Sequence, residues 1–219
     1  IASNAKQKIG LLTDSTCDLP NEILEKHQIQ MIPLNLHFGK STYLDRTTMQ
    51  PEQFYKLLDS SPDYPTTSQP TNKEFYNKYN YLSTHFDSLI GIHLSNKMSG
   101  TWQNSLNAAK KVSEATEKRI DVINSNKLCN SLGLSVLRAA RAIEDGMTHD
   151  EVVANVPKWS NNTRIWVSAR TMKYMVKSGR VSATKGLVGK LLNIKPVVVV
   201  NNDGKSESFG KPFTMKQSR

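Results

Sequence analysis

Short apolar runs and amphipathic stretches alternate along the first 157 residues of this chain. The apolar runs at 8–13, 88–94 and 120–123 are typical of buried strands, and the alternating pattern over 29–38 predicts one or two more. Apolar residues recur at helical spacing in six other segments, at 21–27, 51–60, 73–83, 100–115, 131–145 and 150–159. Strands that alternate with helices predict a parallel sheet with helices on both faces.

The pattern changes after residue 157. Strands are expected at 164–168 and 196–201 with two helices between them, and Asn202-Asp203-Gly204 is a strong hairpin signal. We therefore expect an α/β fold with two lobes, an α/β lobe over residues 1–157 and a smaller α+β lobe over residues 158–219. The second hairpin strand has barely formed when the sequence ends. We expect this lobe to be truncated and the natural chain to continue past Arg219.

Charge separates the same two segments. Of the net charge of +10, residues 1–157 contribute almost nothing, with 16 Lys/Arg and 17 Asp/Glu, whereas residues 158–219 carry 13 Lys/Arg and two acids. A solvated basic face would explain this excess, and so would a docking surface for an acidic partner or a phosphate-bearing ligand. Nucleic-acid binding is not expected, because the basic lobe contains no recognisable nucleic-acid module.

The most informative polar segment, 95–101, follows an apolar strand and opens a helix. Ligands of open α/β sheets bind beyond the carboxyl ends of strands. A helix N-terminus offers unpaired N–H groups and partial positive charge, and Gly100 allows a ligand to approach the backbone. Ser99 can add a hydroxyl, which suits a carboxylate or a phosphate. The competing interpretation, which spacing alone favours, is that Ser99 only caps its own helix.

A second group of hydroxyls, Thr66, Thr67 and Ser68, lies in a loop between Pro65 and Pro70. Prolines at both ends make a loop rigid and so preorganise its hydrogen-bond donors for a ligand. Hydroxyls in such loops also commonly satisfy nearby backbone groups. The sequence by itself leaves both uses open.

Motifs of catalysis and of metal binding are missing from the sequence. It has no Gly-x-Ser-x-Gly motif, no Walker loop and no GxGxxG, and its five histidines and two cysteines lack metal-ligand spacing. His93 is expected to be a packed histidine and Asp14 to cap a turn. We therefore expect no enzyme activity and no cofactor or metal. No membrane span and no signal peptide are visible, so a cytoplasmic location is the default expectation.

The segment Lys177-Ser178-Gly179-Arg180 ends an expected helix of the basic lobe. A glycine C-cap, with basic residues that complement the helix dipole, explains this segment without any ligand. The functional interpretation is that Arg180, beside a glycine turn, points at an anion or at an acidic partner.

Five motifs in a fixed order resemble the DegV family of fatty-acid-binding proteins, and together they extend over nearly the whole chain. They are TDSTCDLP at 13–20, PTTSQP at 65–70, LSNKMSGTWQ at 94–103, YMVKSGRVS at 174–182 and LLNIKP at 191–196. Each motif alone is weak, whereas five in order are specific. Trp102 and Ser178 stand where the family usually has Tyr and Gly, and Asn124-Ser125 replaces an Asp-Ser pair. None of these changes falls on Thr67 or Ser99.

The resemblance implies a two-lobed α/β protein that encloses a long-chain fatty acid at the lobe interface. It implies that Thr67 and Ser99 hold the carboxylate, and we expect Ser68, Gly100 and Thr101 to support them. Family members usually carry further C-terminal residues that complete the second sheet and part of the pocket.

The resemblance also implies a partner. Better-known members of the family present the bound fatty acid to a separate fatty acid kinase, whose acyl phosphate product enters phospholipid synthesis. We expect Lys177 and Arg180 to contribute to docking of that kinase. The alternative is an enzyme or sensor for a small phosphorylated metabolite, held by the same helix N-terminus and Arg180. A fatty acid requires a closed apolar channel with one polar end, whereas a phosphorylated metabolite requires a wet polar pocket.

Overall fold

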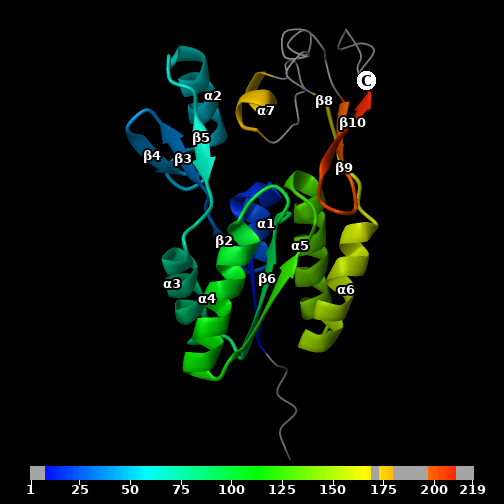
Figure 1. The fold of residues 1–219 in the computed structure, drawn as a ribbon. Helices are drawn as coiled ribbons and strands as arrows, with labels where there is room; N and C mark the ends of the chain where they lie inside the picture. The colour runs from blue at the N-terminus through cyan, green and yellow to red at the C-terminus, as the bar shows by residue number, and fades with distance from the viewer. Residues whose placement is uncertain (1–7, 169–172, 180–196, 211–219) are drawn as a thin grey trace, which may run out of the picture.

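The centre of the molecule is a parallel sheet of four strands in the order β2-β1-β6-β7 (Figure 1). The structure is a computed structural model that describes residues 8–168, 173–179 and 197–210. The strands are β1 (Ile9–Asp14), β2 (Ile29–Ile32), β6 (Ser88–His93) and β7 (Arg119–Asn124). The chain runs outward from β1 to β2 on one side and from β6 to β7 on the other. The topological switch point, where ligands of such sheets bind, therefore lies between β1 and β6.

Helices cover both faces of this sheet, which confirms the predicted layering. Apolar residues of α3 and α4 form one core with β1 and β6, and residues of α5 and α6 form the other, which α1 also joins. The helices are α1 (Asn21–Lys26), α3 (Asn72–Ser83), α4 (Thr101–Thr116), α5 (Cys129–Glu144) and α6 (His149–Asn161). Helix α6 continues through residue 157, the boundary expected between the two lobes.

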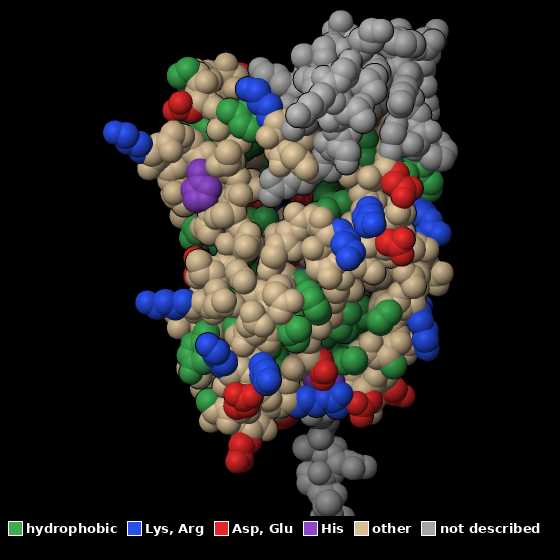
Figure 2. All heavy atoms as spheres, viewed as in Figure 1, with side chains coloured by type: hydrophobic (Ala, Val, Ile, Leu, Met, Phe, Trp, Pro, Cys, Tyr) green, Lys and Arg blue, Asp and Glu red, His purple; other side chains and the backbone are tan. Residues whose placement is uncertain are grey.

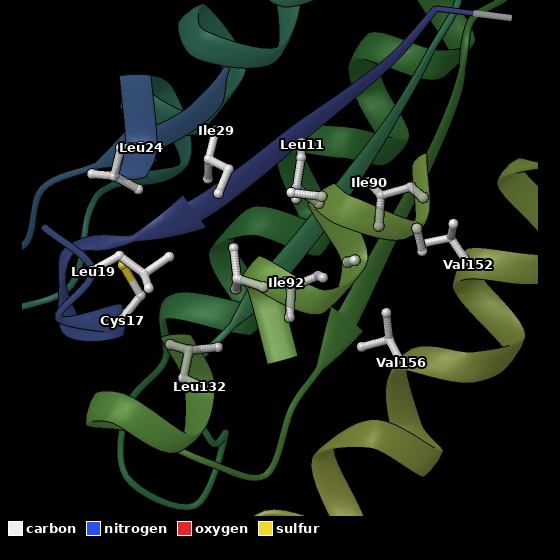
Figure 3. Packing of buried hydrophobic residues seen from close by; sticks show 14 of the residues in the cluster. Leu11, Cys17, Leu19, Leu24, Ile29, Ile90, Ile92, Leu132, Val152 and Val156 are labelled. Carbon is white, nitrogen blue, oxygen red and sulfur yellow. The ribbon is translucent and has the colours of Figure 1, made fainter. Parts of the chain in front are cut away.

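Strand alternation decides which apolar side chain enters which core. Leu11, Ile90 and Ile92 point toward α5 and α6 (Figure 3), whereas the alternate residues Leu12 and Leu89 pack against α3 and α4. Because both faces are buried, these strands are continuous apolar runs without a polar face.

A separate antiparallel sheet, in the order β4-β3-β5, also lies within the first 157 residues. Its strands are β3 (Asn35–Phe38), β4 (Ser41–Leu44) and β5 (Thr66–Ser68), and α2 (Pro51–Ser60) connects β4 to the segment before β5. The sequence predicted only a loop over 61–70, and no strand at β4. Short polar segments carry little strand signal of their own, and β5 is extended because it pairs with β3.

The third sheet is antiparallel and has the order β10-β9-β8. The strands β8 (Trp166–Ser168), β9 (Val197–Val200) and β10 (Ser206–Gly210) confirm the two expected strands and the hairpin. A short helix, α7 (Lys173–Lys177), follows β8, and the second expected helix falls outside the described residues. Figure 1 shows both antiparallel sheets beyond the same end of the parallel sheet.

His149, at the start of α6, ties that helix to the amino ends of β6 and β7. Its Nδ1 lies 2.8 Å from the Ser88 hydroxyl, and its Nε2 lies 2.8 Å from a carboxylate oxygen of Asp121. Ser88 is fully buried, so this Ser-His-Asp arrangement is a structural clamp rather than a nucleophile site. Burial lowers the pKa of His149, although the hydrogen bond to Asp121 opposes the shift.

The His149 clamp predicts that stability falls as the solution is acidified below neutral pH. Because the pKa of His149 is lowered in the native state, the unfolded chain, with its ordinary histidine pKa of about 6.5, takes up a proton first as the pH falls. We expect His149→Gln to be less stable at pH 7.5 and to lose less stability between pH 7.5 and 5.5 than the parent protein. Urea unfolding at both pH values measures this, with exposed His85→Gln as the control. Equal pH dependence in parent and His149→Gln would contradict it.

Candidate ligand-binding site

A cavity of about 320 Å³ lies where the three sheets meet, beyond the carboxyl ends of the parallel strands. This volume is within the range of small-molecule pockets. The apolar part of its lining comes from all three sheets and the loops between them, namely Leu34, Leu36, Leu94, Met98, Leu128, Val167, Met175, Val198 and Val200. The polar part consists of Thr16, Asp45, Thr67, Ser68, Gln69, Ser99 and Ser206. Thr67 and Ser99, the two hydroxyls expected from the sequence, therefore line one cavity.

The carboxylate of Asp14 joins the ends of the two central strands. It accepts hydrogen bonds from the backbone N–H of Leu94 at 3.0 Å and from the hydroxyl of Thr16 at 2.6 Å, and it lies 3.1 Å from His93 Nδ1. The expectation that Asp14 caps a turn is confirmed, because it also accepts from the Thr16 N–H at the start of η1 (Ser15–Cys17). Asp14 thus fixes Thr16 and Leu94 in the cavity wall.

A chain of buried hydrogen bonds continues from Asp14 into the α3–α4 layer. His93 Nε2 lies 2.9 Å from the Ser105 hydroxyl, which lies 2.7 Å from the hydroxyl of Tyr79. All four side chains are fully buried, and burial raises the pKa of Tyr79. The prediction of a packed His93 is confirmed. A β-carbon at Gly91 would lie 2.2 Å from the Tyr79 hydroxyl oxygen, so glycine is needed there.

Ser99 both accepts a hydrogen bond from the first residue of α4, whose N-cap is Gly100, and lines the cavity. Its Oγ accepts a hydrogen bond from the Thr101 backbone N–H at 3.2 Å, at the first residue of α4, and lies 2.8 Å from the Thr101 hydroxyl. The same residue lines the cavity, whereas Thr101 is fully buried and is not part of the lining. The two interpretations that the sequence left open are therefore compatible.

Gly100 lies between Ser99 and the first residue of α4, next to the side chain of Gln69. Its φ of −76° is accessible to any residue, so its backbone conformation does not require glycine. A β-carbon there would lie 2.8 Å from the side-chain nitrogen of Gln69. The position that a β-carbon of Gly100 would take therefore lies against the Gln69 side chain, which itself lines the cavity. Nearby, the Asn104 side-chain amide donates to the carbonyl of Pro70 at 2.8 Å, which fixes the proline-bounded loop to α4.

The register of β5 separates the roles of its adjacent hydroxyls. Thr67 pairs with Leu36, and cross-strand partners share a face, so both contribute to the cavity wall. Ser68 also belongs to the lining, but strand alternation turns its hydroxyl to the other face of β5, where it lies 2.9 Å from His37 Nε2. Among the described residues, nothing forms a hydrogen bond with the hydroxyl of Thr67, which is exposed. Thr67 is therefore available to a ligand, whereas Ser68 supports the small sheet.

Helix α7 contacts the segment just before β5. The rings of Tyr64 and Tyr174 stack with centroids 5.7 Å apart, and the Tyr64 hydroxyl donates to the Tyr174 carbonyl at 2.8 Å. Lys177 Nζ lies 4.7 Å from the centroid of the Tyr64 ring. This contact brings Met175 into the cavity wall. Arg180 lies outside the described residues.

The β9–β10 turn is attached to the loops of the parallel sheet. The Ser95 hydroxyl donates to the Gly204 carbonyl at 2.8 Å, and Lys127 Nζ donates to the Asn202 side chain at 3.0 Å. Burial lowers the pKa of Lys127, and the neighbouring charge of Arg164 adds to the shift. These contacts hold the third sheet against the loops that carry Ser99.

Other kinds of site find little support in the described part of the chain. It contains no group of three or more His, Cys, Asp or Glu side chains that could hold a metal ion. Within the same ranges, no helix is long and apolar enough to cross a membrane. On the face seen in Figure 2, basic and acidic side chains are interspersed. Most basic residues of 158–219 lie outside the described ranges, so their role in docking stays a prediction.

Comparison with known proteins identifies the family. A family model with the description "Uncharacterised protein, DegV family" matches residues 8–219. A DegV domain-containing protein of Clostridium acetobutylicum is 32% identical over 97% of this chain and 74% of its own length. The chain belongs to the DegV family.

Solved DegV structures share the fold. DegV from Bacillus subtilis, described as a fatty acid binding protein, is 30% identical with a TM-score of 0.85, and the match covers 97% of this chain and 74% of that one. A stearic-acid-binding protein from Eubacterium ventriosum is 26% identical with a TM-score of 0.85, covering 96% and 72% of the two chains. This chain thus spans about three quarters of the length of these DegV proteins.

Sequence reasoning missed most of the cavity wall. Leu36, Met98 and Leu128 give no sequence signal of a ligand site, because each is an ordinary apolar residue, the first inside β3 and the other two in loops before helices. The alternation over 29–38 does place Leu36 on a buried face. Its position opposite Thr67 depends on the pairing of β3 with β5, which are about 30 residues apart in the chain.

Gly204→Ala tests the attachment of the third sheet. A β-carbon at Gly204 would lie 2.2 Å from Ser95 Oγ, and the φ of +82° is strained for any L-residue. Gly179→Ala is a matched control, because Gly179 has a φ of +72° and none of the described residues has an atom within 4 Å of an added β-carbon there. We expect Gly204→Ala to destabilise the protein by about 1–3 kcal/mol more than the control does, as measured by chemical unfolding. Equal losses of unfolding free energy in the two variants would show that the turn is not closely packed on Ser95.

Proposed function

We propose that this DegV protein binds a long-chain fatty acid, with the acyl chain in the cavity between the sheets and the carboxylate at Thr67 and Ser99. The observation that carries the proposal is a single, largely apolar cavity whose wall contains both hydroxyls. The solved relatives described as fatty-acid-binding proteins support the ligand class, because they share the fold over nearly all of this chain.

The apolar wall suits an acyl chain. Burial of each methylene contributes about 0.8 kcal/mol, so the tail supplies most of the binding free energy. Residues such as Leu36, Leu94 and Val198 come from three different sheets or their loops, which lets the wall surround a chain rather than contact one side of it. Met98 and Met175 add flexible side chains that adapt to the shape of a ligand.

The polar group of the cavity suits a carboxylate. An ionised carboxylate accepts hydrogen bonds and donates none, so it requires donors. The hydroxyl of Thr67 is free to donate, and Ser99 stands at the N-terminus of the 16-residue helix α4, whose partial positive charge favours an anion. A small phosphorylated metabolite is less well matched, because the described lining contains no Lys or Arg.

The proposal includes a partner kinase that phosphorylates the bound carboxylate. Its support is the family resemblance together with the exposure of Thr67, which leaves the head-group end open to a second protein. The protein supplies the positioned fatty acid, and the phosphoryl transfer belongs to the kinase. Lys177 is exposed and lies over the ring of Tyr64, which precedes Thr67 by three residues in the chain. This position suits contact with an acidic surface of the kinase.

Mass spectrometry of the extracted ligand tests the proposal most directly. The protein is purified from bacterial cells, denatured and extracted with solvent, and we expect a long-chain fatty acid in near-stoichiometric amount. Buffer from a parallel purification of an unrelated protein is the control. An extract without fatty acid, together with no binding of added fatty acids, would contradict the proposal.

Substitutions at the two hydroxyls test the head-group assignment. We expect Thr67→Val and Ser99→Ala each to weaken fatty acid binding roughly tenfold to a hundredfold, since a hydrogen bond to a charged group contributes about 1.5–3 kcal/mol. Thr66→Val is the matched control, because Thr66 is adjacent on β5, exposed and absent from the cavity lining. Titration with a fluorescent fatty acid measures all three. Equal affinities for Thr66→Val and Thr67→Val would contradict the assignment.

Charge reversal at Lys177 tests partner docking separately. We expect Lys177→Glu to slow acyl phosphate formation by a fatty acid kinase severalfold while leaving fatty acid affinity unchanged. Lys111→Glu, an exposed charge reversal on α4, is the control. A normal phosphorylation rate for Lys177→Glu would remove this residue from the docking surface.

A further inference from the structure

We propose that Thr101 orients the hydroxyl of Ser99 so that Ser99 can only donate to a ligand, and that the site thereby favours an ionised carboxylate over a head group that must itself donate. This inference rests on the proposed fatty acid site. It gives the supporting role that the sequence analysis expected of Thr101 a specific form, namely the positioning of the Ser99 hydroxyl.

Thr101 cannot reach the ligand itself. It is fully buried at the first position of α4 and does not line the cavity. Its hydroxyl lies 2.8 Å from Ser99 Oγ. Leaving a buried hydroxyl proton without an acceptor costs about 1–3 kcal/mol, and Ser99 Oγ is the acceptor that the described residues provide. The proton of Thr101 therefore points at Ser99 rather than the reverse.

With both hydrogen bonds from Thr101 in place, only the hydroxyl proton of Ser99 is left to interact with a ligand. A hydroxyl has two acceptor positions and one proton. One acceptor position takes the Thr101 backbone N–H at 3.2 Å, and the other takes the Thr101 hydroxyl. Only the proton of Ser99 remains, and Ser99 lines the cavity. Both constraints come from one residue that the first turn of α4 holds in place.

This arrangement has a consequence for head-group preference. A carboxylate accepts a hydrogen bond from the Ser99 hydroxyl and has no proton of its own that needs an acceptor. A fatty alcohol also carries a proton, for which Ser99 has no acceptor position left. Thr101→Val keeps the shape of the side chain but removes its hydroxyl, so Ser99 regains an acceptor position and its proton is free to turn away from the cavity.

Affinities for hexadecanoic acid and hexadecanol at pH 8, in the full chain, test the inference. We expect Thr101→Val to weaken binding of the acid by about fivefold to tenfold and binding of the alcohol by less than about twofold. Thr101→Ser, which keeps the hydroxyl, should retain the parental ratio of the two affinities. If Thr101→Val does not fold, Thr101→Cys, a weaker donor, should show an intermediate ratio. Equal weakening of acid and alcohol would overturn the inference and indicate a structural role.

A double-mutant cycle separates this inference from the proposed function. If Thr101 acts through Ser99, Thr101→Val has no further effect on acid binding in a Ser99→Ala background, whereas full additivity overturns the inference. A weakened Ser99→Ala with an unchanged Thr101→Val overturns the role of Thr101 alone. A Ser99→Ala protein that binds the acid normally overturns the head-group assignment and, with it, the role of Thr101.

Discussion

The buried carboxylate of Asp14 is the constraint on which the site depends. A charge removed from water must be surrounded by donors, and Asp14 meets this requirement with the backbone of Leu94, with Thr16 and with His93. These donors come from β6 and from the turn after β1, so satisfying one carboxylate brings together the two strand ends at the switch point. The loop that follows Leu94 leads directly to Ser95, which holds the third sheet, and to Ser99.

Around this anchor, polar contacts fix the edges of the cavity while its interior stays mainly apolar. The β5 segment is attached to α4 through Asn104, α7 to that segment through stacked tyrosines, and the β9–β10 turn to Ser95. The residues that make these contacts do not themselves line the cavity. Most of the lining therefore consists of side chains without hydrogen-bonding groups, and the polar side chains that join them are hydroxyls, the Asp45 carboxylate and the Gln69 amide.

The contrast between Thr67 and Ser68 illustrates how neighbouring residues of the same chemistry differ in function. Both residues line the cavity, but strand alternation turns the Ser68 hydroxyl to His37 and leaves the Thr67 hydroxyl without a hydrogen-bond partner among the described residues. A shift of one residue in the pairing of β5 with β3 would exchange these roles. The direction of each hydroxyl on β5 therefore depends on strand register as much as on the choice of residues.

The sequence by itself determined the layered α/β architecture, most helix positions, the hairpin of the basic lobe and the family. These follow from local periodicity, from turn residues and from ordered motifs, all of which act over a few residues. It also indicated Thr67 and Ser99, and it placed His93 and Asp14 correctly. Tertiary structure alone decided that β5 is a strand, that Gln69 covers Gly100, and that Leu36, Val198 and Thr67 meet in one wall. Those outcomes depend on pairing and packing between segments far apart in the chain, where burial and register rather than local preference set the conformation.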